Sequence, residues 1–281
     1  MTLAFSEPIE GAQTRASKSS FYIAMRLMPK AQRQAMFEIY SFCRAVDDIA
    51  DDGGPRESAQ ARLQRWRADL DALYAGRPPA RLAGLALAVK TFGLKLEDFL
   101  AVIDGMEMDV ERTVGAGATD WATLDLYCDR VASAVGRLST RVFGMQEDDG
   151  VALAHHLGRA LQLTNILRDL DEDASVDRLY LPVEALRAAG IVATDPFPAI
   201  NDPNIEKACL AVAARAEGHF KSAAEIFART PAKIARTPRI MGEAYRYILD
   251  RLYARGWTAP RAPLKLGKLK LVLIVARCFL A

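Results

Sequence analysis

The chain has 281 residues, 51% of them hydrophobic and 26% charged, which is long enough and apolar enough to bury a sizeable globular core. The formal net charge is only +2 and the pI is about 8.3. No strong overall charge therefore marks the chain as a nucleic-acid-binding protein, and its partners must be inferred from local sites.

Apolar residues recur at three- and four-residue spacing along most of the chain, which predicts helices. In chain order the predicted helices are 31–52, 57–75, 95–112, 120–143, 149–173, 204–228 and 239–255. Turn-forming stretches separate them: "GGP" at 53–55, "GRPP" at 76–79, "VGAGATD" at 114–120 and "DPFPAINDP" at 195–203. No gap is long enough to act as an interdomain linker. The sequence therefore predicts a single all-α domain over residues 1–281, with eight to ten helices and about 15 flexible residues at the start.

The first acidic cluster, "DDIADD" at 47–52, lies at the end of the first predicted helix. At about 100° per residue, four side chains share a stripe about 60° wide: Tyr40, Arg44, Asp47 and Asp51. Asp48 and Asp52 form a neighbouring pair, expected to support the first pair or to form a solvated edge. So much negative charge is unfavourable at the C-terminus of a helix, where the macrodipole is also negative.

A second acidic cluster lies in "QLTNILRDLDED" at 162–173. One stripe about 80° wide holds four polar side chains: Gln162, Asn165, Asp169 and Asp173. The apolar residues around them predict a mostly buried helix, so this stripe must face something other than the core. Mg²⁺ prefers oxygen ligands and is typically held by carboxylates together with substrate phosphates. Two aspartate pairs facing each other across a cavity therefore predict a Mg²⁺ and diphosphate site.

Other polar groups near these clusters allow two interpretations. Arg44 and Arg168 either contact a diphosphate or form salt bridges with neighbouring carboxylates. His155, His156 and His219 show no zinc-ligand spacing with cysteine and are interpreted as core or surface histidines. The acidic run "DGMEMDVE" at 104–111 points to several faces of its helix and is interpreted as solvated or structural.

Four stretches carry a resemblance to a known family: "SSFYIAMRLMP", "YSFCRAVDDIADD", "YCDRVASAVG" and "LQLTNILRDLDEDASVDRLYLP". In order and approximate spacing they are similar to the squalene/phytoene synthase family, the head-to-head prenyltransferases, over about residues 17–255. The likeness is greatest to the bacterial members that make presqualene diphosphate for hopanoid synthesis. The resemblance implies an all-α isoprenoid synthase fold around a central cavity, with the two acidic motifs on opposite walls.

The resemblance also implies roles for individual residues. The implied metal ligands are Asp47, Asp51, Asn165, Asp169 and Asp173. The implied substrate contacts are Ser20, Phe21, Tyr40, Arg44, Gln162, Asn165, Arg168, Tyr180 and Tyr245. The candidate catalytic residues are Asp47, Asp51, Asp169, Asp173, Arg44, Arg168 and Tyr127.

The activity implied is a transferase that joins two farnesyl diphosphates into presqualene diphosphate, a step of squalene and hopanoid biosynthesis, and releases diphosphate. Mg²⁺ is the expected cofactor, with Mn²⁺ as a substitute, and NADPH is not required for this step. The expected partners are isoprenoid diphosphates and downstream enzymes of the pathway. Phytoene synthase, dehydrosqualene synthase and squalene synthase stay open as alternatives, because pocket depth selects the substrate length. A noncatalytic assembly factor of the same fold is a more distant alternative, disfavoured because both aspartate pairs are intact.

Residues 261–281 combine a basic stretch with "LVLIVARCFLA" and predict a basic, apolar C-terminal helix. This helix is either the last core helix with a solvated edge or a helix that lies on a membrane surface. No apolar run reaches the roughly 20 residues that span a bilayer, and the N-terminus lacks the pattern of a signal peptide. The four cysteines follow no CxxC pattern and are interpreted as reduced core residues. We therefore expect a cytoplasmic protein, with peripheral contact at the inner face of the membrane as the second possibility.

Overall fold

The computed structural model describes residues 22–52, 54–112 and 117–280, and within them all regular structure is helical. Ser20 and Phe21, together with the N-terminal residues expected to be flexible, lie outside the described residues. The prediction of an all-α fold is confirmed. Within the described ranges no helix has the length and apolar character needed to cross a bilayer.

The first part of the chain forms five α-helices and one short 3-10 helix. These are α2 (Tyr22–Arg26), α3 (Lys30–Asp51), α4 (Arg56–Tyr74), η1 (Ala80–Leu82), α5 (Ala83–Phe92) and α6 (Leu96–Glu111). The middle part is α7 (Trp121–Cys128), the π-helix η2 (Asp129–Ser133), α8 (Ala134–Phe143), α9 (Glu147–Arg168) and α10 (Leu170–Ser175). The last part is α11 (Val183–Ala188), α12 (Pro196–Ile200), α13 (Ile205–Arg229), α14 (Ala232–Arg255) and α15 (Lys268–Leu280).

Proline marks the start of several of these helices, because its ring fixes φ near −65° and its missing N–H is not needed there. Pro29, Pro55 and Pro231 directly precede α3, α4 and α14, with φ between −51° and −56°. At α7 the N-cap is instead Asp120, whose carboxylate accepts a 2.7 Å hydrogen bond from the Thr123 backbone N–H. Pro55 and Asp120 lie in the predicted turn stretches 53–55 and 114–120, whereas Pro29 and Pro231 mark helix starts outside these stretches.

The structure has more helices than the eight to ten expected, because some predicted helices are interrupted and others are short. The segment 120–143 contains the π-helical turn η2 between α7 and α8, and the segment 149–173 is interrupted at Asp169. The helix predicted to begin at 239 begins at Ala232 and includes Pro238. The helices α11 and α12 have only six and five residues, too few for a periodic pattern to be recognised.

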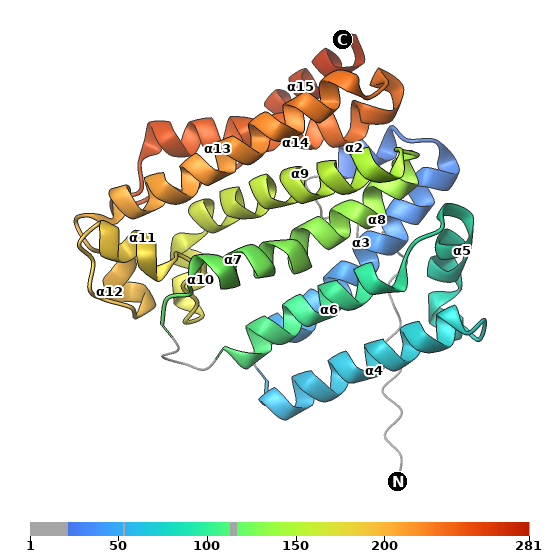
Figure 1. Cartoon of the computed structure of the whole chain (residues 1–281), viewed down its shortest axis with the longest axis horizontal. Helices are drawn as coiled ribbons and strands as arrows, with labels where there is room; N and C mark the ends of the chain where they lie inside the picture. Colours follow the sequence, from blue (N-terminus) through green and yellow to red (C-terminus); the bar gives the residue numbers. More distant parts are fainter. Residues whose placement is uncertain (1–21, 53, 113–116, 281) are drawn as a thin grey trace.

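The long helices lie side by side in one layer (Figure 1). From one edge to the other the order is α4, α6, α8, α9 and α13, each in contact with the next. Helix α3 packs against α4, α5, α6 and α8, and α14 packs against α9 and α13. The short helices α10 and α12 contact each other near the end of α9 (Figure 1).

Two apolar clusters fill the space between these helices. One is built around Phe42, Phe99 and Leu138 from α3, α6 and α8. The other is built around Leu167 and Val212 from α9 and α13. Because α8 and α9 are in contact, the two clusters adjoin. All four cysteines are free thiols, but only Cys128 and Cys209 are buried in the core as expected, whereas Cys43 and Cys278 are partly exposed.

Candidate active site

The first acidic motif occupies the last turn of α3. Arg44 lies one turn before it and forms ion pairs with Asp47 (Nη1 to Oδ2, 2.7 Å) and Asp48 (Nε to Oδ1, 2.8 Å). Asp52 forms a separate ion pair of 2.9 Å with Arg62 of α4. Of the two interpretations of Arg44, the structure shows the salt bridge. Asp48 and Asp52 hold basic neighbours in place.

The second acidic motif lies where α9 ends and α10 begins. Asp169 has non-helical backbone angles (φ −103°, ψ 21°) and caps α9. Its N–H still donates to the Asn165 carbonyl at 2.9 Å, and its own carbonyl accepts from the Asp173 N–H at 2.8 Å. Although α9 is interrupted at Asp169, these two helix-type hydrogen bonds remain, so Asp169 and Asp173 keep their helical spacing. The Asp169 carboxylate accepts two hydrogen bonds from Arg168, at 2.7 and 2.6 Å, so this arginine also forms a salt bridge.

Arg178, in the turn after α10, links the two motifs. Its Nη1 lies 2.9 Å from Asp51 Oδ1, and its Nη2 donates to the Ala50 carbonyl at 3.1 Å. Its positive charge also lowers the pKa of Asp173. The end of α3 and the end of α10 are therefore neighbours in space, although 127 residues separate Arg178 from Asp51.

Asp109 of α6 is a buried carboxylate beside both motifs. It accepts hydrogen bonds from the hydroxyls of Tyr127 (2.9 Å) and Tyr180 (2.7 Å). The two tyrosine rings stack with their centroids 4.9 Å apart. Tyr127 and Tyr180, both predicted from the sequence as site residues, thus donate hydrogen bonds to Asp109, which the sequence analysis did not assign to the site.

Of the two interpretations of the run 104–111, solvated or structural, Asp109 fits only the second, because it is buried and hydrogen-bonded. The structural interpretation also holds for Asp104 and Glu107, which form ion pairs of 2.5 and 2.7 Å with Arg67 of α4. Asp109 follows Met106 by three residues and Val102 by seven, and both are buried. A carboxylate on the apolar face of a helix is the signal that could have identified it.

One aspartate of each motif has a strongly raised pKa. Burial and, after it, the charges of Asp51, Asp48 and Asp109 raise the pKa of Asp47 to about 6, although Arg44 opposes the rise. Burial raises the pKa of Asp173 to about 7, with Asp169 and Asp109 adding to the effect. The Asp109 charge raises the pKa of an aspartate in each motif, so the buried Asp109 lies near both motifs.

Further side chains around this region include the other predicted contacts. Burial raises the pKa of Tyr245 above its usual range, while the adjacent Arg168 lowers it. Gln162 Oε1 accepts a 3.4 Å hydrogen bond from Asn165 Nδ2. Tyr40 is half-buried and packs on the apolar cluster of α3 and α6.

The oxygen donors of the site fit a hard divalent cation. Asn165 Oδ1 is buried and accepts no hydrogen bond from the described residues. Burial is the main cause of the raised pKa of Asp47 and of Asp173, and neighbouring carboxylates add to it, so both groups gain from a nearby positive charge. A buried acceptor without a donor is costly, and a cation bound beside Asn165 and Asp169 would satisfy it.

A cavity of about 560 Å³ adjoins the second motif and is lined by Arg168, Asp169 and Tyr245. The rest of its wall is mostly apolar and comes from α2, α14 and the C-terminal segment: Ala24, Ile240, Ala244, Ile248, Leu264, Leu266 and Leu271. Its volume is in the range of small-molecule sites. The first motif does not line this cavity.

Comparison with known proteins supports the same conclusion as this geometry. Two bacterial proteins named presqualene diphosphate synthase are similar over almost their whole length. The protein of Rhodopseudomonas palustris is 58% identical over 257 residues, covering 92% of this chain and 91% of the relative. The protein of Zymomonas mobilis is 50% identical over 278 residues, covering 98% and 94%. A phytoene synthase of Mycobacterium tuberculosis is 35% identical over 198 residues, covering 70% and 64%.

The fold has a solved counterpart, and a family profile matches most of the sequence. The crystal structure of a dehydrosqualene synthase in complex with ligand superposes with a TM-score of 0.82 at 24% identity, covering 97% of this chain and 95% of that one. The profile described as squalene/phytoene synthase matches residues 14–270. The resemblance inferred from the four sequence stretches is therefore confirmed: the chain belongs to the squalene/phytoene synthase family.

Proposed function

We propose that this chain is a prenyltransferase that joins two farnesyl diphosphates head to head into presqualene diphosphate. The observation that carries the proposal is the convergence of Asp47, Asp51 and Asp173 near the buried Asp109, joined by Arg178. Relatives named presqualene diphosphate synthase that are 50–58% identical over nearly the full chain support this substrate and product. The phytoene synthase relative is only 35% identical and covers less of the chain.

The proposed metal ligands are Asp47 and Asp51 on one side and Asn165, Asp169 and Asp173 on the other. Mg²⁺ bound there would neutralise the charge on a leaving diphosphate, and Mn²⁺ would substitute for it because it prefers similar ligands. Arg44, Arg168 and Arg178 are within reach of the same carboxylates. These arginines would pair with diphosphate oxygens as the carboxylates turn towards the metal.

In the proposed reaction the C–O bond at C1 of the first farnesyl diphosphate breaks, and diphosphate leaves with the bonding electrons. The resulting allylic cation is attacked by a double bond of the second farnesyl chain. Loss of a proton then closes the cyclopropane ring of presqualene diphosphate. No electron donor is needed, so the step proceeds without NADPH.

The face of an aromatic ring attracts positive charge, and the Tyr180 ring, which stacks on Tyr127, already carries the Arg112 guanidinium 4.4 Å from its centroid. Tyr127 is therefore the ring of this pair that we propose to stabilise the allylic cation. Burial raises the pKa of both hydroxyls well above the usual range, so both stay protonated. Their hydrogen bonds to Asp109 fix the ring orientation. We assign these two tyrosines and Asp109 to shaping the cation site and keeping water from it.

The cavity beside Asp169 offers an apolar surface for a prenyl chain. A chain whose diphosphate lies at Arg168 and Asp169 would extend along Ala244 and Ile248 of α14 towards Leu266. A cavity wall of this kind contributes roughly 25 cal/mol for each Å² of apolar surface removed from water. Tyr245 lies at the polar end of the cavity, where it contacts Arg168.

Purified chain with farnesyl diphosphate and Mg²⁺, without NADPH, is expected to release inorganic diphosphate and a cyclopropyl C30 diphosphate. A chelator should abolish turnover and Mn²⁺ should restore it. Parallel assays with geranylgeranyl diphosphate separate this activity from that of phytoene synthase, and NADPH addition separates it from squalene synthase. Absence of turnover with every allylic diphosphate would instead favour a noncatalytic role for the fold.

Substitutions test the metal ligands directly. Asp47→Asn and Asp169→Asn should each lower kcat by at least about 100-fold, because a bound diphosphate loses much of its charge compensation. Asp52→Asn is the matched control: it lies in the same acidic stretch but pairs with Arg62 and should retain most of the activity. Full activity in either of the first two variants would contradict the ligand assignment.

We further propose that the outer face of α15 contacts anionic lipid. Leu271 and Ile274 pack inward against α14, whereas Leu269, Val272 and Leu273 are 75%, 52% and 57% exposed. Basic residues lie among them: Lys268, Lys270 and Arg277. An exposed apolar face with cationic neighbours complements a lipid surface. The cavity is lined by Lys265 and Leu266 just before this helix, so the surface adjoins the cavity.

Co-sedimentation with vesicles checks this contact. The chain should bind vesicles that contain phosphatidylglycerol more strongly than pure phosphatidylcholine vesicles, and Leu269→Glu with Leu273→Glu should abolish the binding. Leu87→Glu on α5 is the control, since Leu87 is 65% exposed but lies on another helix. Equal sedimentation of the double variant and the unchanged chain would exclude the α15 face.

A further inference from the structure

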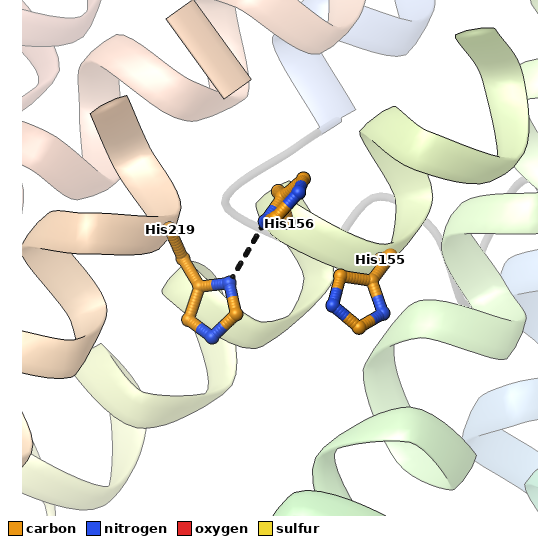
Figure 2. Close-up of side chains that lie close together, drawn as sticks. All are labelled: His155, His156 and His219. Atoms are coloured by element: carbon orange, nitrogen blue, oxygen red, sulfur yellow. Dashed lines mark hydrogen bonds between the residues drawn. The ribbon is translucent and has the colours of Figure 1, made fainter. Parts of the chain in front are cut away.

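We propose that His155, His156 and His219 form a binding site for one transition-metal ion of the zinc class, separate from the acidic motifs. One ligand nitrogen from each histidine lies within 4.8 Å of the other two. Figure 2 shows His155 and His156 on α9 and His219 on α13, gathered where these two helices pack together. They are the only three histidines of the chain. Interpreting them as ordinary core or surface histidines missed this cluster.

Two of the nitrogens already have nearly the spacing that a metal requires. His156 Nδ1 and His219 Nδ1 are 3.0 Å apart, which is the dashed contact in Figure 2. Two nitrogens bound to one tetrahedral Zn²⁺ at 2.0–2.1 Å are about 3.3 Å apart. As a hydrogen bond, the same contact needs one ring to carry its proton at Nδ1. Both Nδ1 atoms could instead bind the metal while each ring keeps its proton at Nε2.

His155 supplies the third ligand after a small movement. Its ring centroid lies 4.8 Å from that of His156 and 5.8 Å from that of His219. Its ring is almost perpendicular to the ring of His156, at 88°. Closing the remaining nitrogen distance of up to 4.8 Å to about 3.3 Å is within the range of a side-chain rotation at a site reached by solvent. Three imidazoles would leave a fourth position open for water.

The charges around the cluster permit a cation. Arg159, one turn along α9, is buried, but Asp125 binds it through two hydrogen bonds of 2.8 and 2.9 Å. Asp129 adds a contact of 3.2 Å to the same guanidinium. Asp129 also pairs with Arg137 at 3.3 Å, so two carboxylates balance two guanidiniums beside the histidines, and a bound cation meets no net positive charge from these four groups.

The protonation state of the histidines supports the same assignment. Burial lowers the pKa of His155 and His156 below the usual range, with Arg159 adding to the effect. Burial and the two other rings lower the pKa of His219 to about 4. At neutral pH the three rings are thus uncharged, which is the form that binds metals. Imidazole nitrogens select Zn²⁺, Co²⁺, Ni²⁺ or Cu²⁺ over Mg²⁺, so the two sites differ in donor chemistry.

A metal here would connect two long helices. Asn165 and Asp169 follow the histidines on α9, and 13 residues from His156 to Asp169 correspond to about 20 Å along a helix. The ion would therefore lie away from the proposed diphosphate site. Its expected effect is to hold α9 against α13 and to stabilise the folded chain in proportion to metal occupancy.

The test uses the untagged full-length chain after chelator treatment. Zn²⁺ titration against a competing chromophoric chelator should give one site per chain with a micromolar or tighter dissociation constant. His219→Ala and His156→Ala should each weaken binding by at least about 10-fold. Co²⁺ should produce visible absorption bands typical of nitrogen ligands, and these bands should be absent in both variants. Zn²⁺ should also raise the Tm of the unchanged chain but not of the variants.

Matched controls separate the histidines from other possible ligands. Asp173→Asn, in the acidic motif, and Cys278→Ser, at a half-buried thiol, should both bind zinc as the unchanged chain does. His219→Gln and His156→Gln replace the alanine variants if circular dichroism shows that those do not fold. Zinc affinity equal in the unchanged chain and in the folded histidine variants, or no binding at micromolar zinc, would overturn the proposal.

Discussion

Arg178 and Asp51 form an ion pair of 2.9 Å that joins the turn after the second acidic motif to the end of the first. Arg178 is mostly buried and also donates to the Ala50 carbonyl. Burial raises the pKa of both Asp109 and Asp173, and the positive charge of Arg178 opposes this rise in both groups. The first prediction follows from this position between the motifs.

Arg178→Ala should lower the free energy of unfolding by about 1–2 kcal/mol in the presence of a chelator, because the carboxylates lose their shared counter-charge. Denaturant titration measures this change. Added Mg²⁺ should recover part of the loss, since it supplies positive charge at the same place. Arg246→Ala is the control, because its ion pairs with Glu217 and Asp250 lie at the surface and should change stability by less than about 0.5 kcal/mol. A similar loss in both variants would argue against a special role for Arg178.

Asp109→Asn tests the buried carboxylate beneath the two tyrosines. Asparagine has nearly the same size, so the fold should be retained, but the hydroxyls of Tyr127 and Tyr180 lose a charged acceptor. Hydrogen bonds to charged groups are worth about 1.5–3 kcal/mol, so kcat/KM should fall by roughly 10- to 100-fold. Steady-state kinetics with farnesyl diphosphate measures the loss.

A double-substitution cycle shows whether Asp109 acts through Tyr127. If it does, adding Tyr127→Phe to Asp109→Asn should lower kcat/KM by much less than Tyr127→Phe does alone. Asp104→Asn is the control on the same helix, since Asp104 pairs with Arg67 and does not reach the tyrosines. Fully additive losses would show that the two residues act independently.

The long helices could be predicted because their apolar faces repeat every three to four residues. The predicted segment 31–52 corresponds to α3 at Lys30–Asp51, and 204–228 corresponds to α13 at Ile205–Arg229. Helix α5 was missed because its sequence, "AGLALAVKTF", is apolar around most of its circumference and shows little periodicity. The interruption at Asp169 has no glycine or proline to announce it.

Helical spacing alone could predict only those site residues that share a helix face, whereas Tyr127, Tyr180 and Tyr245 were predicted from the family resemblance. The stripes with Asp47 and Asp51 and with Asp169 and Asp173 follow from helical spacing alone. Arg178 could not be found in this way, because it lies in a turn and its partner is 127 residues away. The histidine cluster depends similarly on His219, which lies 63 residues after His156 and reaches it only through the packing of α9 on α13.

The raised pKa values predict how stability depends on pH in the presence of a chelator. The folded chain holds the Asp47 and Asp173 protons more tightly than the unfolded chain, where both groups titrate near 4. The stability that this provides is complete below about pH 4 and is lost as the pH rises through about 6 and 7. The pH dependence from these two groups is therefore a decrease in the free energy of unfolding between about pH 4 and 7.

Denaturant titrations at several pH values check this dependence. Asp173→Asn should flatten the decrease, because the amide does not titrate, whereas Asp52→Asn should leave it unchanged. Mg²⁺ should raise the free energy of unfolding at pH 8 and have little effect at pH 5, where protons compete for the carboxylates. An equal slope in the unchanged chain and in Asp173→Asn would contradict the assigned cause.

Gly158→Ala tests the close contact between α9 and the π-helix η2. A Cβ atom at Gly158 would lie 2.8 Å from the backbone N and Cα of Ser133, too close for either backbone to accommodate without moving. The free energy of unfolding should therefore fall by about 1–3 kcal/mol. Gly218→Ala on α13 is the matched control, and its expected change in stability is in the opposite direction. Nothing lies within 4 Å of the added Cβ, so alanine should stabilise the helix by about 0.5–1 kcal/mol. If denaturant titration shows a higher free energy of unfolding for both variants, the packing of α9 on η2 is looser than these distances imply.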